Sequence, residues 1–179
     1  SEAIKHGLIL DSSLLETFER NIVQTKTLEP DLATEIIRKS VSVKANVVSQ
    51  DEKETMGIRI LLNYGHTIGH ALEAATSFSR YLHGEAVSIG MMAAAHISRS
   101  MDLLSDNNVN RQECILRKYG LPVSFSGVPT EAIFDAMQSD KKTSDGSIRW
   151  VLLKDIGHAV TSDQVPPDVV NDALLKIRS

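Results

Sequence analysis

The amino-acid sequence predicts a mainly α-helical domain that carries one small β-hairpin near its C-terminal end. Apolar residues recur at helical spacing through the first two thirds of the chain, and cap or turn residues separate these stretches. The pattern changes after an Asp-Gly turn signal at 145–146, because 147–153 has the composition of a strand. Residues 157–160 can pair with that strand as a hairpin.

The helices of the first third have recognisable start signals. Ser13 and Glu16 fit a capping box ahead of an apolar face. Pro30 can begin the next helix, in which apolar residues form a stripe at helical spacing. A charged break at 51–54 follows, which we expect to be a solvated loop or a helix end.

The remaining helices follow from the same kind of pattern. Residues 58–75 fit one buried helix, and Gly84 opens another whose alanine-rich run allows close contact with its neighbours. A helix over 110–119 stops at a Gly-Leu-Pro turn. Thr130 caps a short helix over 131–138, and a Pro-Pro-Asp sequence begins the last helix.

Length and composition indicate one domain of an ordinary globular protein. The chain has 179 residues, of which 42% are hydrophobic and 23% are charged. A net charge of −4 gives no basic field that would attract nucleic acid or an anionic membrane surface. The single cysteine, Cys114, cannot form an internal disulfide, and no stretch approaches the roughly 20 apolar residues of a membrane span. We therefore expect a cytoplasmic protein.

The first residues suggest that this sequence belongs to a longer protein. A helical pattern begins at Ser1, with neither an initiator Met nor a leader sequence before it. We expect the 1–179 unit to be a segment cut from inside a larger chain.

The chemistry is expected around three of the six histidines, which stand close together in apolar surroundings. His66 and His70 are four residues apart and project from one face of a helix, and His83 follows just before a helix start. Such a pair can bind zinc, but from this spacing alone two core histidines bonded to backbone carbonyls are the more common explanation. No Glu follows the first histidine, so the metalloprotease motif HExxH is absent. Glu85 can be a carboxylate favoured in the first turn of its helix.

Charged and amide side chains accompany the histidines. The spacing of Arg59, Asn63 and His66 allows all three to point the same way, as a cradle for a carboxylate or oxyanion. The alternative is an ordinary ion pair between Arg59 and Glu54. By themselves, 2–5 and 140–142 contain only a surface ion pair and a solvated charge run.

These segments together closely resemble 3-dehydroquinate synthase. The resemblance rests on five stretches in the right order: 59–73 (RILLNYGHTIGHALE), 82–91 (LHGEAVSIGM), 1–8 (SEAIKHGL), 44–52 (KANVVSQDE) and 140–142 (DKK). It covers essentially the whole chain, but only the C-terminal, metal- and substrate-binding half of the family's protein. The nucleotide-binding half, with its Gly-rich loop, has no counterpart here.

The resemblance implies a ligand set for one zinc or cobalt ion. Glu2, His66 and His83 correspond to the family's metal ligands, and His70 corresponds to an acid–base or phosphate-contacting residue. Such a site keeps an open position for substrate oxygens. A zinc ligand set of this kind replaces the bare His66–His70 pair that spacing alone suggests.

The resemblance also implies substrate contacts. Lys5, Asn63 and a lysine of the DKK motif, Lys142 in preference to Lys141, would contact the phosphate. Arg59 and Lys44 would hold the substrate carboxylate and hydroxyls. With His70, the residues implied in catalysis are therefore Lys5, Arg59, Asn63 and Lys142, and those implied in substrate binding are Lys5, Lys44, Arg59, Asn63 and Lys141.

The implied reaction converts the phosphorylated sugar acid 3-deoxy-D-arabino-heptulosonate 7-phosphate to 3-dehydroquinate and phosphate, in the shikimate pathway to aromatic amino acids. It is a carbon–oxygen lyase reaction that uses NAD+, and the family implies a homodimer. The residues that would bind NAD+ are not identified in this sequence. This chain alone is expected to be inactive or nearly so. Two alternatives stay open: another sugar-phosphate cyclase, which product analysis would reveal, and a helical dimerisation module, which would bind no metal.

Overall fold

The computed structural model describes residues 1–52, 57–143 and 148–179, and among these the side chains of 140–143 lie outside the description. Helices make up most of the described chain, and two antiparallel strands near its C-terminal end form a hairpin, so the predicted fold class is confirmed. The elements are α1 (Glu2–Ile9), α2 (Ser12–Arg20), α3 (Ile22–Lys26), α4 (Pro30–Gln50), the 3-10 helix η1 (Arg59–Asn63), α5 (His66–Ala75), α6 (His83–Ser100), α7 (Asp106–Lys118), α8 (Thr130–Thr143), β1 (Trp150–Asp155), β2 (His158–Ser162) and α9 (Pro167–Lys176).

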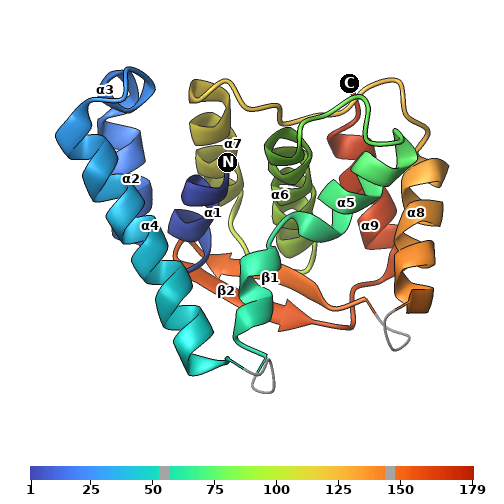
Figure 1. Cartoon of the computed structure of the whole chain (residues 1–179). Coiled ribbons are helices and arrows are strands. Elements are labelled where there is room, and N and C mark those ends of the chain that lie inside the picture. Colours follow the sequence, from blue (N-terminus) through green and yellow to red (C-terminus); the bar gives the residue numbers. More distant parts are fainter. Residues whose placement is uncertain (53–56, 144–147) are drawn as a thin grey trace.

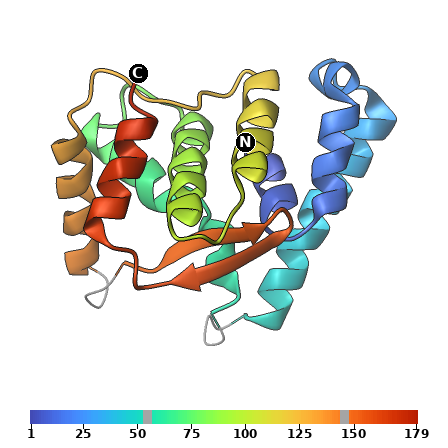
Figure 2. The ribbon, with the colours of Figure 1, turned by 180° about the vertical axis from the view of Figure 1, so that it is seen from behind.

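Helix α6 is the centre of the fold (Figure 1). Its alanine-rich sequence is buried along most of its length, and α5, α7, α9 and β1 all pack against it. Seen from behind, α6 lies between α9 and α7, and the hairpin crosses below them (Figure 2). Small side chains on α6 allow these close approaches, as the sequence predicts. No helix of the described residues is long and apolar enough to cross a bilayer.

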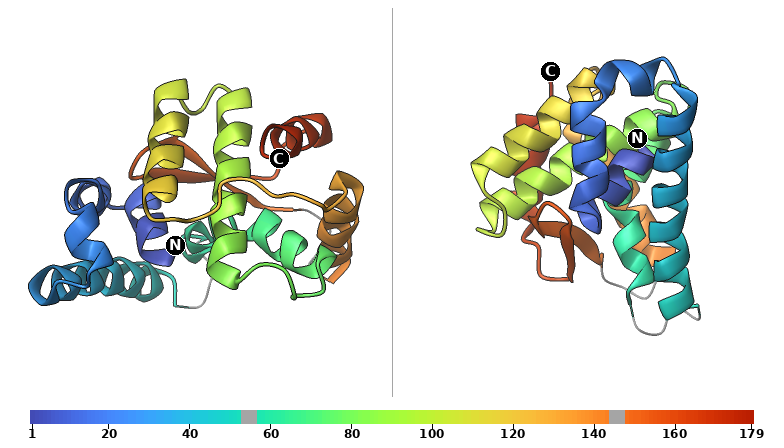
Figure 3. Two further views of the ribbon diagram at one scale, coloured as in Figure 1. Left: turned by 90° about the horizontal axis from the view of Figure 1, so that it is seen from above. Right: turned by 90° about the vertical axis from the view of Figure 1, so that its left-hand side faces the viewer.

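Helix α1 lies in a second group of helices, against α2 and α4 (Figure 3). Its last turn is also tied to the distant hairpin, because the backbone N–H of Gly157 donates a hydrogen bond of 2.7 Å to the carbonyl oxygen of Leu8. Leu8 and Ile9 are completely buried at this junction. The first helix and the β1–β2 turn are therefore fixed relative to each other.

The hairpin joins the two segments that the sequence predicts, although its second strand extends to Ser162. Leu152 lies opposite Val160, and β1 is buried over its first four residues. The described strand begins at Trp150, while the predicted turn at 145–146 and the expected strand start at 147 lie outside the described residues.

The predicted capping box at the start of α2 is wrong. Asp11 caps the helix, since its carboxylate accepts a hydrogen bond of 3.1 Å from the Leu14 N–H. Ser13 donates its hydroxyl to the same carboxylate, and Glu16 pairs with Arg20 at 2.8 Å. An aspartate ahead of the serine reaches the first turn, so neither predicted residue takes the cap position.

Other helix limits differ by a few residues. Helix α4 begins at Pro30 as predicted, but α7 begins before the predicted 110 because Ser105 accepts a 3.3 Å hydrogen bond from the Asn108 N–H. Helix α8 continues to Thr143, beyond the predicted end at 138. The largest departure concerns 58–75, which is a 3-10 helix and an α-helix rather than one continuous helix.

Candidate metal and substrate site

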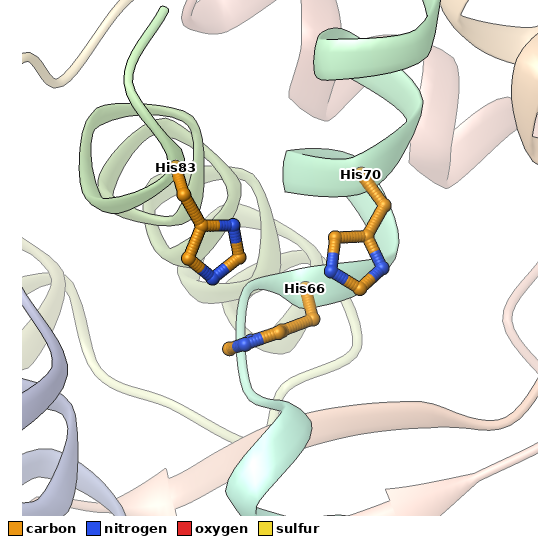
Figure 4. Close-up of side chains that lie close together, drawn as sticks. All are labelled: His66, His70 and His83. Atoms are coloured by element: carbon orange, nitrogen blue, oxygen red, sulfur yellow. The ribbon is translucent and has the colours of Figure 1, made fainter. Parts of the chain in front are cut away.

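Three histidines from two helices form one cluster (Figure 4). His66 is the first residue of α5, His70 lies one turn later, and His83 is the first residue of α6. Their ligand nitrogens all lie within 4.8 Å of one another. A zinc ion with nitrogen ligands at about 2.0–2.1 Å spaces them roughly 3.4 Å apart, so small side-chain rotations would close this cluster on one ion.

A glycine between η1 and α5 sets the direction of the first histidine. Gly65 adopts φ +82°, which breaks the expected helix and starts α5 at His66. A Cβ on Gly90 of α6 would overlap the carbonyl oxygen of Gly65, and one on Gly69 would come within 3.2 Å of the Ala86 backbone. Helices α5 and α6 therefore approach at backbone distance, which brings His83 up to the histidines of α5.

The start of α6 is fixed by the side chain of Glu85 in its first turn. The Glu85 carboxylate accepts a 2.9 Å hydrogen bond from the Leu82 N–H, as in the reciprocal half of a capping box. Glu85 lies in the first turn, as predicted, and it stabilises the position at which His83 leaves the loop.

Glu2 lies beside the histidine cluster rather than inside it. Its Oε1 is 3.6 Å from Nε2 of His66, while its Oε2 forms a 2.7 Å ion pair with Nζ of Lys5. Among the described residues, the group of mutually close ligand atoms consists of the three histidines and does not include Glu2. Glu2 and Lys5 are thus part of the site and not the ordinary surface pair that their spacing alone suggests.

The electrostatic environment keeps His66 neutral. Burial, together with the nearby charge of Lys5, lowers the pKa of His66 to about 4. Its Nδ1–H donates to the Tyr64 carbonyl at 3.3 Å, so Nε2 carries the free lone pair. A neutral imidazole with a directed lone pair is the form that binds metal. This donor set fits a divalent cation such as zinc.

Lys5 and Glu2 modify each other's ionisation. Burial lowers the pKa of Lys5, and the hydrogen bond and charge of Glu2 oppose that shift. Burial raises the pKa of Glu2, but the hydrogen bond and charge of Lys5 outweigh it and lower this pKa below its usual value. The pair is therefore charged at neutral pH and directs one ammonium group toward the neighbouring cavity.

A polar cavity of about 470 Å³ begins at His66 and Glu2. Four cationic side chains reach it from separate elements, and Asn63 adds an amide. An anion such as a phosphate or carboxylate would be held there by charge-assisted hydrogen bonds. The four cationic residues are Lys5, Lys44, Arg59 and Arg149.

Asp51 places Arg59 at this cavity. The carboxylate is buried and accepts backbone hydrogen bonds from Ile58 at 2.8 Å and from Arg59 at 3.3 Å. Asp51 follows the end of α4, as the helix-end alternative for 51–54 predicts, but it is not solvated, because its buried carboxylate caps η1. The rest of that charged break, 53–56, lies outside the described residues and includes Glu54, the expected alternative partner of Arg59.

A second cavity lies on the other side of the cluster. It has about 480 Å³ and is lined by His70, Glu73, Phe78 and His83, with residues of α8. Because His66 lines the first cavity and the other two histidines line the second, the cluster stands between them.

The structure brings most of the residues named from the sequence into one place. Two exceptions are Lys141 and Lys142, whose side chains lie outside the described part of the chain. Arg149 belongs to the cavity but carried no recognisable signal in the sequence, whereas Asp51 lies in the 44–52 stretch of the resemblance but was given no task there. The residues that meet around the cluster and the first cavity are Glu2, Lys5, Lys44, Arg59, Asn63, His66, His70 and His83.

The chain is similar to known proteins in both sequence and fold. The sequence family described as 3-dehydroquinate synthase C-terminal matches residues 1–143. The chain belongs to this family. It is 42% identical over 177 residues to 3-dehydroquinate synthase of Nostoc punctiforme, covering 97% of this chain and 48% of that protein. The corresponding protein of Acidithiobacillus ferrooxidans is 41% identical over 174 residues, with 97% and 48% covered. The chain thus spans about half the length of the curated relatives it matches.

Solved structures of sugar-phosphate cyclases have the same fold. A 2-deoxy-scyllo-inosose synthase complexed with carbaglucose-6-phosphate, NAD+ and Co2+ superposes with a TM-score of 0.79 at 27% identity, over 98% of this chain and 50% of that one. The 2-epi-5-epi-valiolone synthase ValA of Streptomyces hygroscopicus, with NAD+ and Zn2+ bound, gives a TM-score of 0.87 at 24% identity, over 98% and 49%. The helical arrangement around the cluster is therefore that of a cyclase half.

Proposed function

We propose that this chain is the metal- and substrate-binding half of a 3-dehydroquinate synthase, which converts 3-deoxy-D-arabino-heptulosonate 7-phosphate to 3-dehydroquinate and phosphate. The observation that carries the proposal is the cationic cavity that leads directly to three clustered histidines. A phosphorylated sugar acid has two anionic groups, and four cationic side chains from separate elements match such a substrate.

Each residue of the site has a task in this reaction. Lys5 and Asn63 would contact the phosphate, together with Lys142 or Lys141 of α8, and stabilise the charge that develops as phosphate leaves. Arg59 and Lys44 would hold the carboxylate and hydroxyl groups and so fix the ring against the metal site.

Proton transfer is assigned to His70. Its ring centroid lies 5.2 Å from that of His66 and 5.8 Å from that of His83, so it is close to any group held by the cluster. An imidazole can accept a proton at one ring nitrogen and donate one from the other, so it can relay a proton during elimination. The resemblance to the family assigns His70 to the substrate and Glu2 to the metal, although the mutually close ligand atoms among the described residues are those of the three histidines.

Two bound groups complete the reaction. Glu2, His66 and His83 would hold one zinc or cobalt ion, which supplies a Lewis acid that lowers the pKa of a substrate hydroxyl. NAD+ supplies a reversible hydride acceptor, and we assign its binding mainly to the half of such enzymes that this chain does not match. The parent protein is proposed to be a cytoplasmic homodimer and a carbon–oxygen lyase.

Anomalous diffraction at the zinc edge, on crystals grown with zinc, tests the ligand set. We expect a peak bounded by Glu2, His66 and His83, with His70 outside the coordination shell. A peak among His66, His70 and His83 would replace Glu2 as a ligand and remove His70 from proton transfer. Absence of any peak would contradict the metal site.

Product analysis tests the substrate. A full-length enzyme that contains this half should release phosphate from 3-deoxy-D-arabino-heptulosonate 7-phosphate and form 3-dehydroquinate. Because 2-deoxy-scyllo-inosose synthase shares the fold, glucose 6-phosphate, which has no carboxylate, is the competing substrate to compare. Preference for glucose 6-phosphate would favour another cyclase activity. In that case Arg59→Gln should leave the KM for glucose 6-phosphate unchanged, because this substrate has no carboxylate for Arg59 to hold.

A further inference from the structure

One buried carboxylate beside the cluster has no task in the reaction proposed above. Glu73 is only 7% exposed, and it lies on α5 three residues after His70 and seven after His66. This spacing places all three side chains on one face of the helix. A buried carboxylate requires a compensating partner, because its desolvation is costly.

The partner is the third histidine of the cluster. Nδ1 of His83 lies 3.1 Å from Oε1 and 3.3 Å from Oε2 of Glu73. An ionised carboxylate only accepts hydrogen bonds, so the proton of the neutral imidazole must be on Nδ1. The lone pair is then on Nε2, and a ring nitrogen of His83 is directed toward His66 (Figure 4).

We propose that Glu73 is a positioning residue that fixes the tautomer and ring orientation of His83 for metal binding. Its carboxylate holds Nδ1–H, orients Nε2 toward the cluster and increases the basicity of the ligand nitrogen. The inference rests on the proposed function, because it takes His83 as a metal ligand.

The position of the pair in the fold supports this role. Glu73 belongs to α5 and His83 begins α6, so the hydrogen bond spans the same helix contact that Gly65 and Gly90 make close. Both residues also line the second cavity, away from the cationic side chains of the first. Glu73 therefore contacts His83 from the side of the second cavity, opposite the cationic side chains of the first.

The first test needs no metal. Long-range 1H–15N correlation spectra of the metal-free chain at alkaline pH report which ring nitrogen carries the proton. We expect the Nδ1–H tautomer of His83 in the wild type and in Glu73→Gln, whose amide oxygen still accepts the hydrogen bond. Glu73→Ala should shift His83 toward the Nε2–H tautomer, the commoner form of free imidazole side chains. An Nε2–H tautomer in the wild type would overturn the proposal.

The second test measures zinc affinity by competition with a chromophoric chelator. Glu73→Ala should weaken zinc binding by about 10–100-fold, the range for removal of a partner that orients a ligand. Glu73→Gln should lose less, because it keeps the hydrogen bond and removes only the charge. The matched control is Glu16→Gln, since Glu16 is an exposed carboxylate of α2 paired with Arg20, and it should leave zinc affinity unchanged.

Failure of the proposed metal site and failure of the role of Glu73 give different results. If the wild type binds no zinc, the proposed metal site fails, and the inference fails with it. If the wild type binds zinc and His83→Ala reduces the affinity while both Glu73 variants bind as tightly as wild type, only the inference is overturned. Circular dichroism confirms folding, and Glu73→Gln provides the decisive comparison should Glu73→Ala not fold.

Discussion

The ammonium group of Lys5 lies 2.7 Å from Oε2 of Glu2, although the lysine side chain is only 2% exposed. The same carboxylate places Oε1 3.6 Å from Nε2 of His66. One side chain therefore connects a cation of the first cavity to the histidine cluster. A change in either the first cavity or the cluster is expected to affect the other through Glu2.

Replacement of Lys5 by Met should weaken anion binding. The variant keeps the length of the side chain but removes a charged donor, which contributes about 1.5–3 kcal/mol, or roughly 10–100-fold in affinity. Stability should change by less than about 1 kcal/mol, because Glu2 is 47% exposed and remains solvated. Calorimetric titration with the substrate and urea unfolding measure the two quantities. The control is Lys39→Met, which removes a comparable helical ion pair with Glu35 outside the cavity and should leave substrate affinity unchanged. Equal losses of substrate affinity in both variants would contradict a specific role for Lys5.

Replacement of Gly90 by Ala should force α5 and α6 apart. The added methyl group would overlap the Gly65 carbonyl oxygen and lie 2.8 Å from the Gly69 nitrogen, with a cost of about 1–3 kcal/mol or more. Because the same contact brings His83 to the other histidines, zinc affinity should fall together with Tm. Gly84→Ala is the control on the same helix, since its Cβ would only touch Ser1 at 3.4 Å. Wild-type zinc affinity in the Gly90 variant would show that helix spacing does not set the cluster.

Replacement of Tyr64 by Phe should destabilise the fold next to the site. The hydroxyl of Tyr64 is completely buried and donates to Oε1 of Gln112 at 2.9 Å, so its removal leaves a buried amide oxygen without this donor. The expected loss is about 1–3 kcal/mol in urea unfolding. Tyr119→Phe is the comparison, because Tyr119 donates to the Phe18 carbonyl at 2.9 Å in a partly exposed position. Its smaller effect would confirm that burial determines the cost, and a larger effect would argue against it.

The buried His6 should make stability depend on pH. Burial, with the nearby charge of Lys5, lowers its pKa to about 4 in the folded chain, compared with 6.5 for the unfolded group. Above pH 6.5 His6 is neutral in both the folded and the unfolded chain, so its protonation takes nothing from the free energy of unfolding. As the pH falls from 6.5 toward 4, the unfolded state takes up the proton first, so the free energy of unfolding decreases.

The check compares urea unfolding at pH 7.5 and pH 4.5 in the wild type and in His6→Gln. The variant should lose less stability between the two pH values, because one of the buried histidines no longer contributes. His158→Gln, at an exposed position of the hairpin, should behave like the wild type. An identical loss in the His6 variant and the wild type would contradict the assignment.

Periodicity and turn signals predicted the fold class, most of the helices and the hairpin, but not the helix caps, the short helix α3 or the division of 58–75. The α2 cap depended on Asp11 rather than Ser13, a choice that local composition does not decide. The break between η1 and α5 depended on Gly65, whose left-handed conformation is required by the close approach of α6. That requirement is a tertiary contact, so a helical pattern across 58–75 could not reveal it.

Some residues of the candidate site could likewise be predicted from the sequence, and others could not. Resemblance to a known family located Glu2 and Lys5, which spacing alone describes as a surface pair. Arg149 was missed because only the fold carries it from the start of the hairpin to the cavity. Glu73 could have been found, since its position seven residues after His66 puts it on the histidine face of α5.

The hydrogen bond from Gly157 to Leu8 has a consequence for synthesis of the protein on the ribosome. Lys5 emerges among the first residues of this half, whereas Arg149 and the β1–β2 turn emerge after nearly all of it has been translated. Contacts so distant in sequence form only after long loops close. Helix α1 can pack against α2 and α4 as these emerge, but its last turn lacks its hydrogen bond to the β1–β2 turn until the hairpin has left the exit tunnel. Truncation before residue 157 during translation would leave nascent chains in which the last turn of α1 has no partner in the hairpin.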